Sequence, residues 1–246
     1  MELQEYMFPV EARPVTVPDG IMGSNYQIPS HYKAIVREDT NKVISIVKNS
    51  YQIVRNEDLI NNLMSELSQL DTPFRIESSH SFVNNNKMRL QVVFPELTMW
   101  DTDSEIALSL YLHNSYDMSE GVRFMFGAIR SICTNGMVFG KILSKYYAKH
   151  TKGFKIGNLK DVLSDTYNQI PSIQDRIKEL ESTPVTEELM KSVEKGVGKK
   201  LSKRVFEQYP QTQWEMYNGL TNYISHVMEP RFRARYQQSV SRVFAL

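Results

Sequence analysis

Two short polar segments hold the side chains of this sequence that are best suited to chemistry. The first is His113-Asn114-Ser115-Tyr116-Asp117 and the second is Cys133-Thr134-Asn135-Gly136. Each follows an apolar run that predicts a strand, so we expect these side chains to project from loops, where binding and catalytic residues concentrate. The same residue types could also serve the backbone alone, because Asn and Asp close Asx turns and Asn-Gly supplies a positive φ. The sequence leaves both interpretations open.

Patterns for catalysis or metal binding are weak in this chain. None of the five histidines is paired with Cys or Glu at zinc spacing, and neither a GxxxxGK[ST] nor a GxGxxG phosphate loop is present. Asp101-x-Asp103-x-Glu105 resembles part of a cation-binding loop but lacks the later glycine and glutamate. With Asp117, these aspartates allow a metal-dependent nuclease as the third-ranked hypothesis. We expect no cofactor, and a binding protein is favoured over an enzyme.

Lysines recur every four residues in two places, and this spacing puts each set on one face of a helix. The first set is Lys141, Lys145 and Lys149, and the second is Lys191, Lys195, Lys199 and Lys203. Like charges at this spacing repel, whereas an unrelieved row of cations suits a polyanion whose phosphates release counterions. Tyr146 and Tyr147 could stack on bases beside the first set. The alternative is that the lysines only solubilise a helix and the tyrosines are buried.

The net charge of +1 conceals an uneven distribution. Residues 1–130 contain 11 Lys and Arg against 17 Asp and Glu, whereas residues 131–246 contain 18 against 11. This division suggests one surface for an anionic partner. No apolar run reaches the roughly 18 residues of a membrane span, no basic leader is present, and the single cysteine cannot form an internal disulfide. We therefore expect a cytoplasmic protein that does not contact a membrane.

The elements that would position these residues indicate an α+β fold. Four prolines make residues 1–30 an extended, irregular segment. Residues 31–150 are expected to form an α+β core, an antiparallel sheet with one packed helix that Asn56 caps and that ends near Leu70. The strands predicted in the core are 32–37, 42–47, 74–82, 88–94, 105–113 and 122–132.

A helical region is predicted to follow the sheet. After Asn135-Gly136 the hydrophobic period becomes helical, which predicts a helix over Val138–His150. Residues 151–246 form a basic helical region expected to pack on or beside the core, with helices over about 158–181, 183–208 and 212–227 and a last segment from Pro230. Thr212 and Glu215 match a capping box. Gly196 and Gly198 predict a break within the second lysine set.

These residues carry a resemblance to a known family. NSYD at residues 114–117, followed by FMFGAIRSICTNGMVFG at 124–140, is similar to the central block of the phage/plasmid-like protein family, a catalogued domain of unknown function (number nine-three-two). The hairpin sequence KAIVREDT at 33–40 and the segment 214–223 also resemble that family, so the likeness spans most of the chain. Met118 is a departure, since the family commonly has glycine there. The resemblance implies a phage, plasmid or integrated element as the source and no established activity.

The leading hypothesis is a non-catalytic nucleic-acid-binding protein of a phage or plasmid. It would bind or anneal single-stranded DNA in recombination or replication, as an oligomer, and its sheet-plus-helix plan also resembles the single-strand annealing recombinases of mobile elements. The seven lysines of the two sets would neutralise phosphates. The secondary contacts would be Arg123, Arg130, Tyr146 and Tyr147. The second hypothesis is a protein-binding modulator or inhibitor of a host factor.

Overall fold

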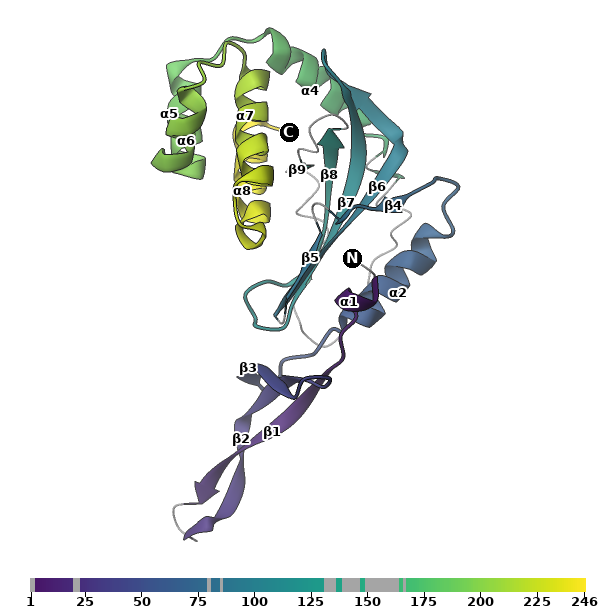
Figure 1. The fold of residues 1–246 in the computed structure, drawn as a ribbon, viewed down its shortest axis with the longest axis vertical. Coiled ribbons are helices and arrows are strands. Elements are labelled where there is room, and N and C mark those ends of the chain that lie inside the picture. Colours follow the sequence, from purple (N-terminus) through teal and green to yellow (C-terminus); the bar gives the residue numbers. More distant parts are fainter. Residues whose placement is uncertain are drawn as a thin grey trace.

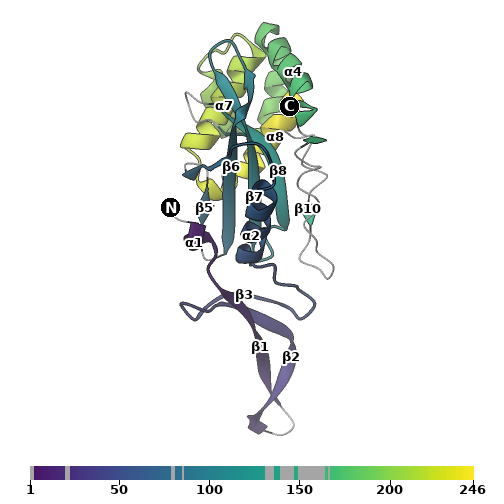
Figure 2. The ribbon, with the colours of Figure 1, turned by 90° about the vertical axis from the view of Figure 1, so that its right-hand side faces the viewer.

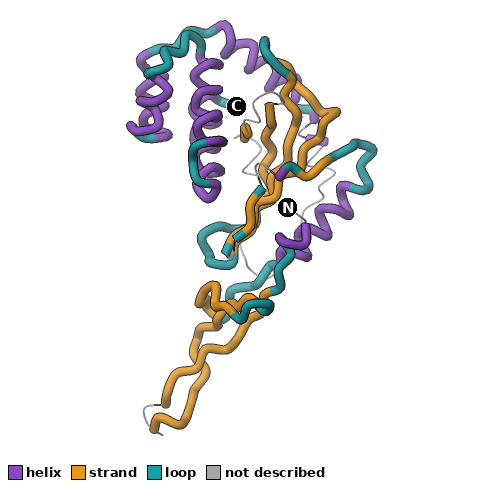
Figure 3. The backbone as a smooth tube through the Cα atoms, viewed as in Figure 1, coloured by secondary structure: helices purple, strands orange, loops and turns teal. Residues whose placement is uncertain are grey.

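The computed structural model describes residues 3–19, 23–78, 81–84, 86–130, 136–138, 147–148, 164–165 and 167–246. These residues form two antiparallel sheets and a group of C-terminal helices (Figure 3). The α+β class expected from the sequence is confirmed. Among the described residues, no helix combines the length and hydropathy that a membrane span requires.

A three-stranded sheet projects from one end of the molecule (Figure 1). The short helix α1 (Leu3–Tyr6) precedes its strands, which are β1 (Val10–Asp19), β2 (Gly23–Arg37) and β3 (Lys42–Lys48) in that order across the sheet. The expected β2–β3 hairpin is confirmed, and Asn41 turns it with a φ of 55°. The prediction that residues 1–30 are irregular is wrong. Pro14 and Pro18 lie in β1, an edge strand, where a missing N–H is tolerated.

The second sheet forms the centre of the molecule, with the strand order β10-β8-β7-β6-β4 and with β5 on β6 and β9 on β8. Its strands are β4 (Arg75–Ile76), β5 (Phe82–Val83), β6 (Lys87–Trp100), β7 (Glu105–Ser115), β8 (Val122–Arg130), β9 (Gly136–Val138) and β10 (Tyr147–Ala148). The predicted turn between β5 and β6 is confirmed, because Asn84 Oδ1 accepts hydrogen bonds from the N–H groups of Asn86 and Lys87 at 2.9 and 2.8 Å. Of the strand predicted over 74–82, Arg75–Ile76 and Phe82 lie in strands, whereas residues 77, 78 and 81 do not.

The helix predicted over Val138–His150 is wrong at both ends. Gly136–Val138 pairs with residues 127–129 of β8, and Tyr147–Ala148 pairs with residues 122–123 of the same strand. β8 otherwise presents an open edge of backbone N–H and C=O groups, and these short strands satisfy part of it. Sheet pairing at a distance therefore overrides the local helical period here.

Helices cover both faces of the central sheet, with α2 (Asn56–Leu67) on one side and the C-terminal helices on the other (Figures 1 and 2). On β7, Leu110 and Leu112 are fully buried in one cluster with Leu59 of α2. The intervening Tyr111 packs on the opposite face, against Ala234 of α8. The alternation predicted for this strand is confirmed, and it divides the sheet into an aliphatic face and a more polar one.

The C-terminal helices are α4 (Ile170–Ser182), α5 (Glu187–Val197), α6 (Lys199–Phe206), α7 (Gln213–His226) and α8 (Pro230–Phe244). α7 and α8 lie next to the sheet, and α5 and α6 pack outside them (Figure 1). The predicted capping box is confirmed, since Thr212 Oγ1 accepts from the N–H of Glu215 at 3.1 Å and the Glu215 carboxylate accepts from Thr212. The predicted start at Thr183 is wrong. Thr183 ends α4, and Thr186 caps α5.

Candidate functional site

The second lysine set lies on the exposed face of α5 and α6. Thr186 Oγ1 opens α5 by accepting a hydrogen bond from the N–H of Leu189 at 3.2 Å. The underside of both helices is apolar and buried, through Val193, Val197, Leu201 and Val205. Each lysine of the set lies two positions before one of these apolar residues, and residues two apart on a helix point to opposite sides. All four lysines are exposed, and we call them the lysine stripe: Lys191, Lys195, Lys199 and Lys203.

Gly198 divides this lysine stripe into two halves. Its φ of 83° and ψ of 157° belong to a region that only glycine occupies without strain. Its N–H donates to the carbonyl of Glu194 at 2.8 Å, which ends α5, and its own carbonyl accepts from the N–H of Ser202 at 3.1 Å, which begins α6. The predicted break is therefore confirmed at Gly198, whereas Gly196 lies inside α5.

An open hollow of about 550 Å³ lies beside the second half of the stripe. Its lining consists of Met190, Glu194, Lys199, Ser202, Lys203, Phe206, Glu207 and Tyr209. The Lys199 ammonium is 3.8 Å from a Glu194 oxygen, and that of Lys203 is 3.9 Å from a Glu207 oxygen. The row is thus partly compensated, unlike the unrelieved row expected. Both lysine side chains are nevertheless highly exposed, 91% and 79%, so solvent screens these pairs strongly.

The other predicted nucleic-acid contacts are scattered or lie outside the described residues. Arg123 is half-buried on β8, directly across from His113 on β7, and Arg130 is at the far end of the same strand. The backbone of Tyr147 pairs with that of Arg123 in β10. The predicted residues outside the described part are Lys141, Lys145, Lys149, Tyr146, Thr134 and Asn135.

The polar segment 113–117 is mostly buried and joins β7 to the start of α2. Asn114 Nδ2 donates to the Val54 carbonyl and to Asn56 Oδ1, both at 2.8 Å. The Tyr116 hydroxyl accepts from the Asn56 N–H at 2.8 Å. The expectation that Asn56 caps α2 is wrong, because Asn56 is the first residue inside the helix. Its side chain instead accepts a hydrogen bond from Asn114 and donates one to the Tyr6 carbonyl.

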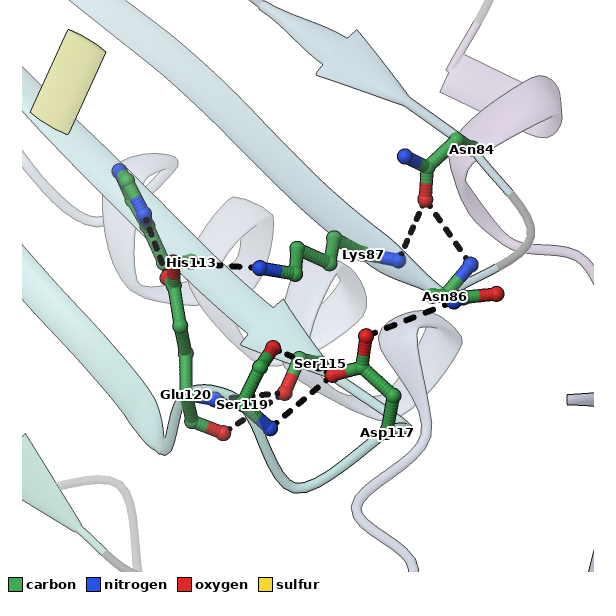
Figure 4. Close-up of polar contacts among 8 residues, drawn as sticks. All are labelled: Asn84, Asn86, Lys87, His113, Ser115, Asp117, Ser119 and Glu120. Atoms are coloured by element: carbon green, nitrogen blue, oxygen red, sulfur yellow. Dashed lines mark hydrogen bonds and ion pairs between the residues drawn. The ribbon is translucent and has the colours of Figure 1, made fainter. Parts of the chain in front are cut away.

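The turn after β7 is closed by two side chains of this segment (Figure 4). Ser115 Oγ donates to the Glu120 carbonyl at 2.7 Å and accepts from the Glu120 N–H at 3.0 Å. Asp117 accepts from the Ser119 N–H at 3.0 Å. Met118, the departure from the family's glycine, has a φ of 59°, a left-handed conformation that glycine adopts without strain. These contacts shape a loop.

Glu120 is the centre of a partly buried charge cluster at this end of the sheet (Figure 4). Its Oε1 lies 3.6 Å from Lys87 Nζ and its Oε2 lies 3.5 Å from His113 Nδ1. Burial opposes the charged carboxylate, but His113, Lys87 and Arg123 outweigh it and lower the pKa of Glu120 to about 2. Burial lowers the pKa of His113 to about 4, so this imidazole is neutral at pH 7.

The histidine of this pair does not reach solvent as a catalytic base would need to, although the Glu120 side chain is 22% exposed. The His113 side chain is 4% exposed, and its Nε2 is buried without a hydrogen-bond partner among the described residues. Nδ1 faces the carboxylate, so neither nitrogen is presented to a substrate. A general base must come within hydrogen-bond reach of the proton it removes. This geometry therefore favours a structural role for His113.

A buried polar layer between the sheet and α8 was missed by the sequence reasoning. Arg89 is 1% exposed, its guanidinium lies 4.4 Å from the centre of the Tyr111 ring, and it donates to Gln237 Oε1 at 3.0 Å. Gln91 Nε2 donates to the Tyr111 hydroxyl at 2.9 Å. Arg89 and Gln91 alternate with Leu90 on β6, and all three are buried. The alternation of a strand would have placed Arg89 and Gln91 together on one face, and this was the signal available in the sequence.

The three candidate metal ligands do not come together. Asp101 precedes β7 and Asp117 follows it, and an 11-residue strand spans roughly 35 Å. Asp101 is already used, since Oδ1 accepts from the N–H groups of Asp103 and Ser104 at 3.0 and 2.7 Å, and Oδ2 accepts from Trp214 Nε1 at 2.9 Å. In the part of the chain that is described, no group of three His, Cys, Asp or Glu side chains could hold a metal ion.

Comparison with known proteins gives one match. A family model described as "Domain of unknown function (DUF932)" matches residues 43–246, which run from β3 to the end of the chain and include the polar turn and the lysine stripe. No curated protein and no solved structure matches the chain.

Proposed function

Since the chain belongs to the family described as Domain of unknown function (DUF932), a description that carries no activity, we propose a function from the geometry: non-catalytic binding of single-stranded DNA along α5 and α6. The sequence resemblance implies a phage or plasmid source, which supports a role for this binding in recombination or replication. The protein would act as an oligomer in the host cytoplasm, and annealing of complementary strands would be its activity.

The observation that carries this proposal is the exposed lysine stripe of α5 and α6. Between Lys191 and Glu207 the chain holds six Lys and Arg and two Glu. The four stripe lysines are exposed, so each ammonium can contact a phosphate without a rearrangement of the fold. Cations of this kind release counterions from the nucleic acid and bind its backbone without reading sequence. The hollow beside Lys199 adds an apolar surface on which an unpaired base could stack.

A salt series of single-stranded DNA affinity tests the proposal. The Lys191/Lys195/Lys199 triple glutamate variant removes three cations of the stripe. Each phosphate contact contributes about −0.7 to the slope of log affinity against log salt for single strands, so the slope should fall by about 2. Between about 50 and about 200 mM salt, the wild type should therefore lose roughly 20-fold more affinity than the variant.

A variant with the same change in charge provides the matched control. Lys42, Lys48 and Lys178 are exposed and lie on β3 and α4, away from the stripe. Their triple glutamate variant should retain the wild-type affinity and slope. If the wild type does not bind at low salt, or if both triple variants lose affinity equally, the stripe is not the binding surface and the proposal is wrong.

A protein-binding role has a separate observation in its favour. The projecting sheet exposes Tyr32, Val43 and Ile46 by 47%, 55% and 56%, although apolar strand residues are usually covered. A modulator of a host factor could use this face. A stoichiometric host protein that the wild type retains after nuclease treatment, and that a Val43→Asp/Ile46→Asp variant does not, would favour this second candidate. Equal recovery by both would remove it.

A further inference from the structure

Tyr209 is the most exposed large apolar or aromatic side chain in the described part of the chain, at 79%. It lies three residues after the end of α6 and lines the hollow together with Lys199 and Lys203. A tyrosine ring has a large apolar face, and the apolar wall of the hollow, from Met190 and Phe206, is available to cover it. Tyr209 nevertheless stays 79% exposed, so this wall covers little of it.

The backbone at Tyr209 is held in an uncommon conformation. Tyr209 has a φ of 51°, a left-handed conformation that is uncommon for residues other than Gly, Asn and Asp. Its N–H donates to the Phe206 carbonyl at 2.9 Å, and its carbonyl accepts from Gln211 Nε2 at 2.7 Å. Pro210 follows and restricts the chain further. Strained residues of this kind persist where the surroundings impose them, and they concentrate at binding sites.

The lining of the hollow fits one nucleotide. Tyr209 contributes an aromatic ring to the lining. Lys199 and Lys203, one helical turn apart on α6, contribute two highly exposed ammonium groups, each within 4 Å of a glutamate oxygen. The volume of about 550 Å³ lies within the range of small-ligand sites. Flat, sequence-tolerant stacking surfaces beside cations are how single strands are held, because every base has a π face and every nucleotide has a phosphate.

We propose that Tyr209 is the platform on which one unpaired base stacks, with Lys199 and Lys203 holding the flanking phosphates. This inference rests on the proposed function and names the subsite that makes it selective for single strands. In a duplex both faces of a base are already stacked, so the Tyr209 ring has no partner there. Tyr209 contributes affinity without neutralising a phosphate, which separates its effect from that of the lysines.

Substitution of Tyr209 by leucine and by phenylalanine tests the platform. The probe is a fluorescein-labelled oligothymidylate, alongside an oligonucleotide of equal length built from abasic sites. Tyr209→Leu should weaken oligothymidylate binding by about 5- to 100-fold and leave the salt slope unchanged. Tyr209→Phe keeps the aromatic face and should bind within about 3-fold of the wild type. Tyr167→Leu is the matched control, because Tyr167 is 59% exposed and lies just before α4.

The abasic oligonucleotide shows whether any loss comes from stacking. The wild type should bind it more weakly than oligothymidylate, whereas Tyr209→Leu should bind both alike, so a general folding defect would give a different pattern. If the wild type binds with the expected salt slope and Tyr209→Leu binds equally well, the platform is wrong and the proposed function stands. If the wild type binds neither probe at low salt, both are wrong.

Discussion

Replacing Asp101 with alanine should destabilise the protein by about 4–5 kcal/mol or more, which is the lower end of the sum over its three hydrogen bonds. The carboxylate is 8% exposed and accepts hydrogen bonds from the N–H groups of Asp103 and Ser104 and from Trp214 Nε1. Hydrogen bonds to charged groups contribute roughly 1.5–3 kcal/mol each, and a buried donor left without a partner costs about 1–3 kcal/mol. Trp214 is 4% exposed and stacks on Tyr217, so its N–H cannot turn to solvent.

A graded series separates the contributions. Asp101→Asn retains one carbonyl acceptor for the backbone N–H groups and loses the acceptor for Trp214, so it should cost about 1–2 kcal/mol. Trp214→Phe removes the other partner of that bond. The double variant should therefore be less destabilised than the sum of the two single variants. Urea unfolding followed by circular dichroism gives all four free energies of unfolding.

Asp103 is the matched control because its side chain is exposed. Asp103→Ala should change the free energy of unfolding by less than about 0.5 kcal/mol. Equal stability losses in Asp101→Ala and Asp103→Ala would refute the structural role assigned to Asp101. A rise in wild-type stability on adding Mg²⁺ that both alanine variants lack would instead restore a cation-binding role for these two aspartates.

Acid should destabilise the protein in two steps, because the pKa values of His113 and Glu120 are both lowered, the first by burial and the second by its cationic neighbours despite burial. The contribution of His113 is complete above its ordinary pKa of 6.5 and is lost as the pH falls toward about 4, and that of Glu120 is complete above 4.5 and is lost toward about 2. Above pH 4.5, the urea midpoint of His113→Gln should therefore change less with pH than that of the wild type. Below pH 4.5, the same should hold for Glu120→Gln. If the midpoints of both variants change with pH in parallel with the wild type, both assignments are wrong. Gly198→Ala should lower the free energy of unfolding, measured with urea, by about 1–3 kcal/mol. The loss would come from backbone strain alone, because a Cβ at this position meets nothing within 4 Å. An unchanged stability would show that the turn relaxes.

Features set by local sequence were predicted well. The capping box at Thr212 and the turn at Asn84 each need only a few adjacent residues, and both formed as expected. The alternation of β7 was readable because one face is consistently aliphatic. The break at Gly198 followed from the poor helix propensity of glycine. In each case the signal and the structure lie within one turn or one strand.

Features set by distant pairing were predicted poorly. The segment 138–150 has a helical period. Residues 136–138 and 147–148 nevertheless pair with β8, which supplies backbone partners that no local pattern reveals. Asn56 has the chemistry of a helix cap, but Asn114, 58 residues away, takes its side chain. The left-handed conformation of Tyr209 had no signal beyond the following proline. By contrast, the Lys203–Glu207 pair lies four residues apart and could have been foreseen.

The polar segment that carries the family resemblance is best understood as a joint between the two sheets. The Tyr116 ring packs edge-on against Phe8 at 5.7 Å, and its carbonyl accepts from Ser45 Oγ at 2.5 Å. The Tyr51 hydroxyl donates to the Ser115 carbonyl at 3.1 Å. Phe8 lies just before β1 and Ser45 lies on β3 of the projecting sheet, whereas Ser115 ends β7 and Tyr116 follows it. Most polar groups of this segment bind one part of the chain to another, and the two without a partner among the described residues, His113 Nε2 and Asn114 Oδ1, are buried, so the segment has little capacity left for a substrate. Binding by this protein is therefore to be sought on its exposed surfaces, and among the described helices α6 has the densest positive charge, with four Lys and Arg in eight residues.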